Sequence, residues 1–345
     1  MVEWKKLGEI CELERGVRVI KKDLQQEGLI PVYQNSLTPL GYFDKSNYPE
    51  CTPFVICAGA AGEVGFCSKP FWAADDCTCI LCSSLANKKY IYYCLLVNQH
   101  TLKSQVRKAS VPRLSKNVIG KLVIPIPSLE EQARIVGILD TFTASIDNLK
   151  EQIAQRRKQY EYYRDQLLDL EGKEGVEMKK LGEVCEMERG VRVVKKDLQE
   201  EGVIPVYQNS LTPLGYYEKS NYPKNTTFVI CAGAAGEVGY SKVDFWAADD
   251  CTCIVCPISI SSRYVYYHLM VKQHLLKAQV RKASVPRLSK DVIAKQQVFI
   301  PSLQEQQRIV SILDTFEASI QNLEAQLSQR EKQYEYYRNK LLTFE

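Results

Sequence analysis

The stretch Ile30–Tyr42 reads IPVYQNSLTPLGY, and the same letters return without a change as Ile204–Tyr216. The repeat extends over residues 1–171, at a constant offset of 174 residues and without an insertion or a deletion. A period of this length is a whole domain with its connector, because solenoid repeats have periods of about 20–50 residues. The sequence therefore predicts two similar units, which suit a partner with two equivalent half-sites. Duplex DNA is the commonest such partner, because its two-fold symmetry lets symmetric protein halves read an inverted repeat.

The composition of the 345-residue chain is that of a globular protein, with 45% apolar and 25% charged residues. Its longest nearly apolar stretch, Tyr90–Val97, is too short to span a bilayer, and the first residues lack the basic-then-apolar pattern of a signal peptide. The 13 cysteines do not suggest a disulfide framework and fit a reducing compartment. We therefore expect a cytoplasmic protein with no membrane contact. The net charge of +4 does not by itself identify a partner.

The first part of each copy has the texture of a compact α+β domain. Short runs rich in Val, Ile, Tyr, Phe and Cys are broken by Gly, Pro, Asn and Asp, and Leu29–Gln34, Phe54–Cys57 and Thr78–Cys82 are predicted strands. Tyr90–Lys108 lacks Gly and Pro and has apolar residues at helical spacing, which predicts a helix.

The second part of each copy has the heptad pattern of a long coiled-coil helix. Apolar residues recur at alternating spacings of four and three, and the predicted seam is Ile135, Leu139, Phe142, Ile146, Leu149, Ile153, Ile309, Leu313, Phe316, Ile320, Leu323 and Leu327. Ser128 with Glu131, and Ser302 with Glu305, predict capping boxes at the helix starts. Each helix should be about 60 Å long, at about 1.5 Å per residue.

We expect the two long helices to pack against each other in antiparallel orientation, with pseudo-two-fold symmetry. The expected organisation is a globular domain over residues 1–127, a long helix over 128–171, a linker and second globular domain over 172–301, and a second long helix over 302–345. Arg156 and Arg330 occupy apolar positions of the register, where each would need a partner such as Asp147 or Glu317.

A basic run in each copy is a candidate phosphate-binding segment. Lys103–Lys116 has five basic residues and no acid, and Lys277–Lys290 differs from it only at Ala278. Basic side chains and hydroxyl donors bind DNA phosphates. The candidates are Lys103, Arg107, Lys108, Arg113, Ser115, Lys116, Lys277, Arg281, Lys282, Arg287, Ser289 and Lys290. The alternative is a solvated helix end whose charges only keep the domain soluble.

A polar segment after a predicted strand is a candidate for base recognition. It contains Tyr33, Gln34 and Asn35, repeated as Tyr207, Gln208 and Asn209. Gln and Asn can pair with adenine through two hydrogen bonds in the major groove. The alternative is a turn in which Asn35 bonds its own backbone.

Other conspicuous motifs have structural interpretations. The segment Gly59–Gly65 lacks a nucleotide-binding pattern and predicts a tight turn between strands. Cys77, Cys79 and Cys82 resemble metal ligands, but zinc sites usually use paired Cys-x₂-Cys elements or added His ligands, and the three histidines are not close in sequence. The alternation of Cys77 and Cys79 instead predicts one face of a buried strand. The pair Asp75-Asp76 predicts a turn or strand end. We expect no catalytic residue and no metal site in this chain.

Ala109–Asp140 (ASVPRLSKNVIGKLVIPIPSLEEQARIVGILD) and Ala283–Asp314 closely resemble a region typical of type I restriction–modification specificity subunits. The second copy departs from the pattern with Val298-Phe299-Ile300-Pro301 and Leu303-Gln304-Glu305-Gln306. The openings Trp4–Glu9 and Met178–Glu183 also look like those of the family. The resemblance covers essentially the whole chain. It implies two target-recognition domains, each followed by a long helix.

The resemblance implies a non-catalytic subunit that selects DNA for its partners. Those partners would be two methyltransferase subunits, which modify adenine, and restriction subunits, which cleave DNA. S-adenosylmethionine, ATP and Mg²⁺ would bind the partner subunits, and this chain would hold no cofactor. Because the two copies are nearly identical, the expected target is bipartite and near-palindromic. The alternatives are a nuclease or methyltransferase acting alone, whose motifs the chain lacks, and a coiled-coil scaffold with two non-DNA ligand-binding modules.

Overall fold

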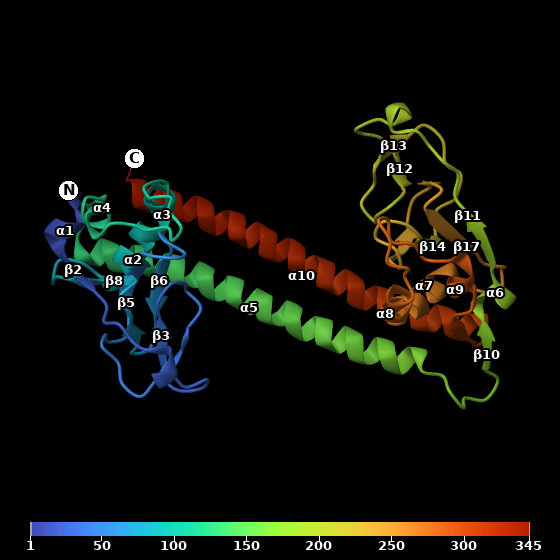
Figure 1. Cartoon of the computed structure of the whole chain (residues 1–345), viewed down its shortest axis with the longest axis horizontal. Helices are drawn as coiled ribbons and strands as arrows, with labels where there is room; N and C mark the ends of the chain where they lie inside the picture. The colour runs from blue at the N-terminus through green and yellow to red at the C-terminus, as the bar shows by residue number, and fades with distance from the viewer. Residues whose placement is uncertain (1, 345) are drawn as a thin grey trace. The chain divides into compact units, whose positions relative to one another are not determined.

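A computed structural model of the chain describes residues 2–344 (Figure 1). Contacts between residues divide the chain into two compact units, unit 1 with residues 2–150 and 325–344, and unit 2 with residues 151–324. Each long helix therefore contributes one part to each unit. Within residues 2–344, no helix combines the length and the apolar composition that a membrane span requires.

Unit 1 contains three small sheets, paired in the orders β1-β9, β2-β8-β5-β6 and β4-β3-β7. All these pairs are antiparallel except β3 with β7. The strands are β1 (Glu3–Lys6), β2 (Cys11–Arg15), β3 (Ile30–Tyr33), β4 (Gly41–Phe43), β5 (Thr52–Ile56), β6 (Val64–Cys67), β7 (Trp72–Ala73), β8 (Cys77–Cys82) and β9 (Val123–Ile126). The three strands predicted from the sequence are confirmed with small shifts of their ends.

The four-stranded sheet of unit 1 is buried on both faces, and its side chains alternate between two cores. Val55 of β5 and Ile80 of β8 pack in a cluster with helix α2 (Lys88–Val97). Phe54 and Cys79 point to the other face, in an aromatic cluster with Phe71. This alternation follows from the two-residue period of a strand. The cysteines thus serve as small buried side chains, as the sequence predicts.

The single helix expected over Tyr90–Lys108 is instead two helices, α2 and α3 (Gln99–Ser104). The side-chain amide of Asn98 donates to the carbonyl of Cys94 over 2.9 Å and closes α2. Helix α3 ends at Ser104, so the following residues do not continue it. A short helix α1 (Leu7–Ile10), a 3₁₀ turn η1 (Lys21–Asp23) and a helix α4 (Lys116–Gly120) complete this part.

Unit 2 repeats these elements with the same topology, paired in the orders β10-β18, β11-β17-β14-β15 and β13-β12-β16. Its strands are β10 (Glu177–Lys180), β11 (Glu186–Arg189), β12 (Ile204–Tyr207), β13 (Gly215–Tyr217), β14 (Thr226–Ile230), β15 (Val238–Ser241), β16 (Trp246–Ala247), β17 (Cys251–Val255) and β18 (Gln297–Ile300). Its short helices are α6 (Leu181–Val184), η2 (Lys195–Asp197), α7 (Ser262–Val271), α8 (Gln273–Ala278) and α9 (Lys290–Ala294). The predicted α+β fold with two tandem copies is confirmed.

The long helices are α5 (Leu129–Leu168) and α10 (Leu303–Thr343). Ser128 Oγ accepts a hydrogen bond from the Glu131 backbone N–H over 3.3 Å, which satisfies one of the free donors at the start of α5. The predicted capping box is only half formed, because the Glu131 carboxylate accepts two hydrogen bonds from Arg134. The second copy shows the same arrangement with Ser302, Glu305 and Arg308.

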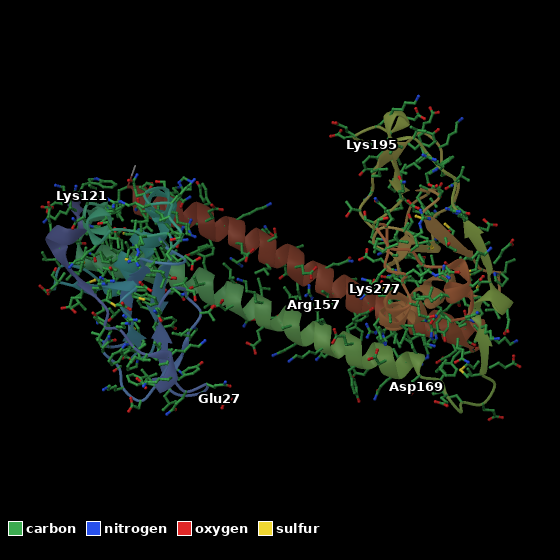
Figure 2. The ribbon with its side chains drawn as sticks, viewed as in Figure 1. Glu27, Lys121, Arg157, Asp169, Lys195 and Lys277 are labelled. Carbon is green, nitrogen blue, oxygen red and sulfur yellow. The ribbon has the colours of Figure 1, made fainter. Side chains whose placement is uncertain are left out.

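In each unit, α5 and α10 run antiparallel, as predicted. In unit 1, Phe142 stacks on Tyr337 with ring centres 5.4 Å apart, and Lys150 Nζ lies 3.5 Å from Glu331 Oε1. In unit 2, Tyr163 stacks on Phe316 at 5.5 Å. Arg157 lies on the side of α5 that faces α10 (Figure 2) and pairs with Glu324. In both units the residue numbers rise along α5 as they fall along α10.

The seam has two kinds of position. Ile135, Leu139, Ile309 and Leu313 are fully buried and belong to the cores that the long helices share with the globular parts. Farther along, Ile146 and Ile153 are also buried, whereas the remaining seam positions are half-buried: Phe142, Leu149, Phe316, Ile320, Leu323 and Leu327.

The two arginines of the seam find aromatic partners rather than the expected carboxylates. The Arg156 guanidinium lies over the ring of Phe316, with Cζ 5.9 Å from the ring centre, and Arg330 lies over Phe142 at 5.7 Å. A guanidinium over an aromatic face keeps its charge and its packing without a buried carboxylate.

Candidate nucleic-acid interface

The basic run of unit 1 forms an exposed loop that the backbone closes between Arg107 and Arg113. The Arg107 N–H donates to the Arg113 carbonyl over 2.9 Å, and the Arg113 N–H donates back over 3.2 Å. The residues from Arg107 to Arg113 are all exposed. We call residues 107–113 the basic loop. It is not a solvated helix end, because α3 ends at Ser104 and the loop has its own backbone pairing.

The glycine turn between β5 and β6 holds the basic loop beside the polar segment after β3. Gly59 N–H donates to the Pro112 carbonyl over 3.2 Å, and Ala60 N–H donates to the Asn35 carbonyl over 2.9 Å. Gly59 has a φ of +81°, and a Cβ there would lie 2.7 Å from the Asn35 carbonyl oxygen. Only glycine fits such a close approach with positive φ. Two segments that the sequence predicts to bind DNA are therefore neighbours.

Three cationic side chains of the basic loop have no ion-pair partner among residues 2–344. Among residues 2–344, no carboxylate lies within ion-pair distance of Arg107, Lys108 or Arg113. Three positive charges on one short loop create a strongly positive local potential. This arrangement suits the phosphates of a nucleic-acid backbone.

Two residues of the predicted phosphate set have structural partners instead. Lys103 Nζ lies 3.8 Å from Glu63 Oε1, so the fold supplies the acid that the basic run lacks. Ser115 Oγ accepts a hydrogen bond from Asn117 N–H over 3.3 Å and caps α4. Both contacts recur in unit 2, where Lys277 lies 3.4 Å from Glu237 and Ser289 caps α9. Lys277, on α8, is labelled in Figure 2.

The predicted base-reading residues have three different environments. The ring of Tyr33 packs in the aromatic core against Phe54, with ring centres 4.9 Å apart, and burial raises the pKa of Tyr33 to about 12. Tyr33 is therefore a core residue, because its side chain points to the inner face of β3. Gln34 is half-buried, and its amide donates to Asp76 Oδ2 over 3.5 Å. Asn35 is exposed.

The side-chain amide of Asn35 is available to a ligand. Among the residues from 2 to 344, none makes a hydrogen bond to this amide, so the turn in which Asn35 bonds its own backbone is not formed. Its neighbour Ser36 makes the local turn instead, by donating to the Thr38 carbonyl over 3.1 Å.

A cavity of about 160 Å³ lies at the base of the basic loop. Its lining combines basic, acidic and small side chains from four separate segments: Arg15, Cys57, Ala58, Asp75, Asp76, Thr78, Arg113, Leu114 and Lys116. Arg15 is not among the residues that the sequence predicts. Its Nε donates to the Asp75 carbonyl over 2.6 Å, a contact across 60 residues that no local pattern reveals.

The buried cysteines hold the polar segment in place. The Cys77 thiol lies 3.4 Å from the Tyr33 carbonyl and 3.3 Å from the Gln34 carbonyl. Burial raises the pKa of Cys77 well above its ordinary value, so the thiol keeps its proton and can donate. In the described part of the chain, no group of three or more His, Cys, Asp or Glu side chains is placed to hold a metal ion.

Unit 2 repeats the interface. The Arg281 N–H donates to the Arg287 carbonyl over 2.9 Å, and Gly233 N–H donates to the Pro286 carbonyl over 3.3 Å. Ala234 N–H donates to the Asn209 carbonyl over 2.9 Å, while Tyr207 packs on Phe228 at 4.9 Å. The Gln208 amide donates to Asp250 Oδ2 over 3.4 Å. Lys282 and Lys290 are exposed, like their first-copy counterparts Lys108 and Lys116.

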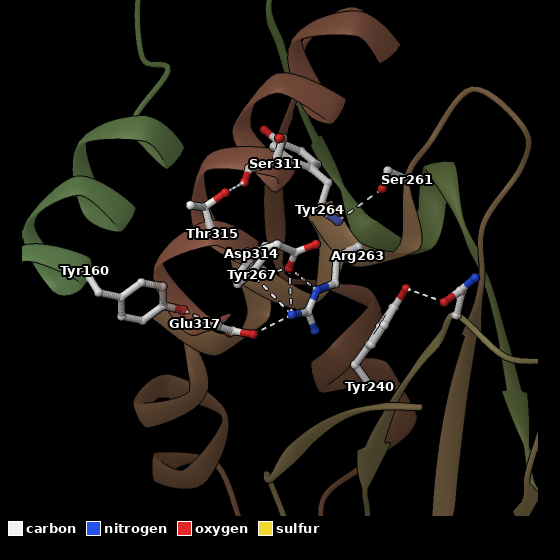
Figure 3. Close-up of polar contacts among 11 residues, drawn as sticks. Tyr160, Tyr240, Ser261, Arg263, Tyr264, Tyr267, Ser311, Asp314, Thr315 and Glu317 are labelled. Carbon is white, nitrogen blue, oxygen red and sulfur yellow. Dashed lines mark hydrogen bonds and ion pairs between the residues drawn. The ribbon is translucent and has the colours of Figure 1, made fainter. Parts of the chain in front are cut away.

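Unit 2 also contains a polar anchor between its globular part and α10 (Figure 3). Arg263 of α7 donates from Nε to Asp314 Oδ1 over 2.8 Å, and its terminal amino group donates to Glu317. The guanidinium carbon lies 4.6 Å from the ring centre of Tyr240 and 4.7 Å from that of Tyr267. Burial alone would lower the pKa of Arg263, but the carboxylates of Glu317 and Asp314 raise it above its ordinary value.

The first copy has a simpler contact at the position of this anchor. Lys89 Nζ lies 2.8 Å from Asp140 Oδ1, and the Tyr93 hydroxyl donates to the same oxygen over 2.6 Å. In both units an ionised group and a tyrosine thus join the short helix to the long one. The sequence does not single out these residues, because Tyr93 lies 47 residues from Asp140, and Arg263 lies 51 residues from Asp314.

The chain is similar to known proteins in both its sequence and its fold. A family model described as "Type I restriction modification DNA specificity domain" matches residues 1–156 and 173–331. The specificity subunit of the type I restriction enzyme EcoR124I/EcoR124II of Escherichia coli is 30% identical, over 99% of this chain and 94% of that protein. The EcoprrI specificity subunit of Escherichia coli is 25% identical, over 92% of this chain and 88% of that protein.

The fold is similar to that of a solved specificity subunit. The crystal structure of a type I restriction–modification system S subunit from M. genitalium matches with a TM-score of 0.80 and 20% identity. The match covers 99% of this chain and 96% of that one. At this level of identity, the likeness establishes the fold.

Proposed function

Because this chain belongs to the family of type I restriction–modification DNA specificity proteins, we propose that it binds an interrupted, near-palindromic duplex target. One observation carries this proposal. The basic loop and the exposed asparagine beside it occur in both units, with identical sequence and the same backbone contacts. Two identical reading surfaces in one chain should bind two identical half-sites. On antiparallel DNA, such half-sites are most simply arranged as an inverted repeat.

The two kinds of residue have different roles in this proposal. Arg107, Lys108 and Arg113 neutralise phosphates, which fixes the position of the domain on DNA and contributes affinity for any sequence. Asn35 reads a base edge, because its free amide offers the donor and acceptor pattern that pairs with adenine. Arg281, Lys282, Arg287 and Asn209 do the same for the second half-site.

The chain acts as the selecting subunit of a larger enzyme. Two methyltransferase subunits modify adenine at the sites it binds, and restriction subunits cleave DNA in the full complex. S-adenosylmethionine, ATP and Mg²⁺ serve these partner subunits, and the chain is itself non-catalytic. The family supports this assignment, because its relatives in Escherichia coli are specificity subunits of type I restriction enzymes.

Selection from random DNA tests the proposal. The purified chain, together with its methyltransferase subunits, is incubated with a random duplex pool, and the retained duplexes are sequenced. We expect an inverted repeat with an unread spacer. Asn35→Ala together with Asn209→Ala should relax the sequence preference at equivalent positions of both half-sites. No enrichment of any duplex would contradict DNA recognition and would favour a scaffold with other ligands.

A further inference from the structure

The charges beside the helix seam differ between the two copies at two equivalent positions. Lys150 and Arg157 of α5 correspond in the repeat to Glu324 and Glu331 of α10. The sequence around the second of these positions is otherwise constant. Between Gln155–Arg164 and Gln329–Arg338, the only difference is arginine against glutamate at 157 and 331. The reversal at 157 and 331 therefore stands within ten residues that are otherwise repeated letter for letter.

These four residues meet in two ion pairs across the helices. In unit 1, Lys150 Nζ lies 3.5 Å from Glu331 Oε1. In unit 2, an Arg157 guanidinium nitrogen lies 2.5 Å from Glu324 Oε1. Each of the four residues follows a seam residue directly in the sequence, so each flanks the apolar seam. Charges at such flanking positions set which helices pair and in which orientation.

The charges discriminate between possible partners. If two copies of α5 paired in the same antiparallel register, Lys150 of each would face Arg157 of the other. If two copies of α10 paired, Glu324 of each would face Glu331 of the other. Like charges would then meet at both sites in either arrangement. Only the pairing of α5 with α10 places opposite charges at both sites.

We propose that Lys150, Arg157, Glu324 and Glu331 form a pairing code that selects α10 as the partner of α5 and opposes pairing of either helix with its own kind. The four side chains are 41–61% exposed, so each pair alone contributes little stability. The selectivity comes from the difference between two attractive and two repulsive contacts. Near-identical repeats need such a device, because their apolar seams alone cannot distinguish pairing of α5 with α10 from pairing of either helix with a second copy of itself.

Charge variants of the full-length chain test the code, because they place like charges at both contact sites between α5 and α10. Glu324→Lys with Glu331→Arg gives both helices the charges of α5, and Lys150→Glu with Arg157→Glu gives both the charges of α10. The reversed variant combines all four changes. The matched controls are Glu161→Lys with Glu335→Lys and Lys158→Glu with Lys332→Glu, which change the net charge equally at exposed positions.

Unfolding of each variant is followed in urea at low salt. We expect both imitation variants to raise the unfolding equilibrium constant about tenfold over their controls, and the reversed variant to return to the wild-type value. High salt should reduce the differences, because it screens exposed charges. The code is overturned if the imitation variants unfold like their controls, or if the reversed variant remains as unstable as they are.

Discussion

Arg263 Nε and Asp314 Oδ1 are 2.8 Å apart, in a contact that ties helix α7 of unit 2 to the long helix α10. Tyr267 donates to the same carboxylate oxygen over 2.5 Å, so one acid of α10 serves two side chains of α7. In the first copy, Lys89 and Tyr93 of α2 contact Asp140 of α5 in the same way. This equivalence predicts which substitutions at position 263 unit 2 tolerates.

Arg263→Ala should destabilise unit 2 by about 3 kcal/mol, because Asp314 and Glu317 lose a buried partner. Arg263→Lys should cost clearly less, since lysine can pair with Asp314 as Lys89 pairs with Asp140. Urea unfolding of the two variants measures the difference. Equal unfolding midpoints for Ala and Lys would show that the charge at 263 contributes nothing.

His268 makes unit 2 sensitive to acid. Burial, and then the charge of Lys272, lower the pKa of His268 from 6.5 to about 3, and its Nε2 lies 2.9 Å from the Tyr264 hydroxyl. The unfolded chain takes up this proton near its ordinary pKa, whereas the folded chain does not. The stabilisation is therefore complete above pH 6.5 and is lost as the pH falls toward 3.

The first copy has Cys94 at this position, which gives a matched variant. The wild type should lose about 2 kcal/mol at His268 between about pH 7.5 and about pH 5, and His268→Cys should lose correspondingly less. Unfolding free energies at the two pH values provide the comparison. If the variant and the wild type respond equally to pH, His268 does not remain neutral in the folded state.

Arg107→Ala with Lys108→Ala should weaken binding to every duplex alike and flatten the dependence of affinity on salt. The same result is expected for Arg281 and Lys282. Binding titrations at several salt concentrations measure the slope, and Lys158→Ala with Lys332→Ala on the long helices serves as the control. An unchanged slope would mean that the basic loop faces solvent in the complex.

Leu149→Asp should disturb the helix seam, because it places a carboxylate at a half-buried apolar position. We expect affinity for a full bipartite site to fall about tenfold or more, while affinity for a duplex with one half-site changes little. Leu323→Asp is the equivalent change in the second copy. Ala144→Asp, at an exposed position of the same helix, is the control. Full-site affinity that survives Leu149→Asp would show that this seam does not hold the two reading surfaces together.

Local patterns predicted the elements well. The four-three spacing of apolar residues and the caps Ser128 and Ser302 indicated the long helices, because these signals act within one helical turn or along one face. The glycine turn and the buried cysteine strand were predictable for the same reason. The prediction of a single helix over Tyr90–Lys108 is wrong, because Asn98 ends α2 with a side-chain hydrogen bond that competes with continuation of the helix.

The details of the site depend on contacts that are distant in sequence. The basic run predicts that Lys103 binds phosphate, but the fold brings Glu63 to it from 40 residues away. The polar segment predicts that Tyr33 contacts a base, but the direction of its side chain depends on which face of β3 is covered. Arg15 and Arg263 were missed, because their partners come from other elements. The sequence therefore predicts the candidate interface as a region, and the fold determines which of its side chains have partners within the chain.

Mapping of DNA methylation tests most directly the central claim, that two nearly identical units bind two copies of the same half-site. Methylated adenines are mapped across the genome of a host that carries the gene and of a host from which it is deleted. We predict that methylation which depends on the gene occurs at one motif with two nearly identical, inverted halves, whose centres lie about 10 bp apart. A gene-dependent motif with two unrelated halves would contradict the account.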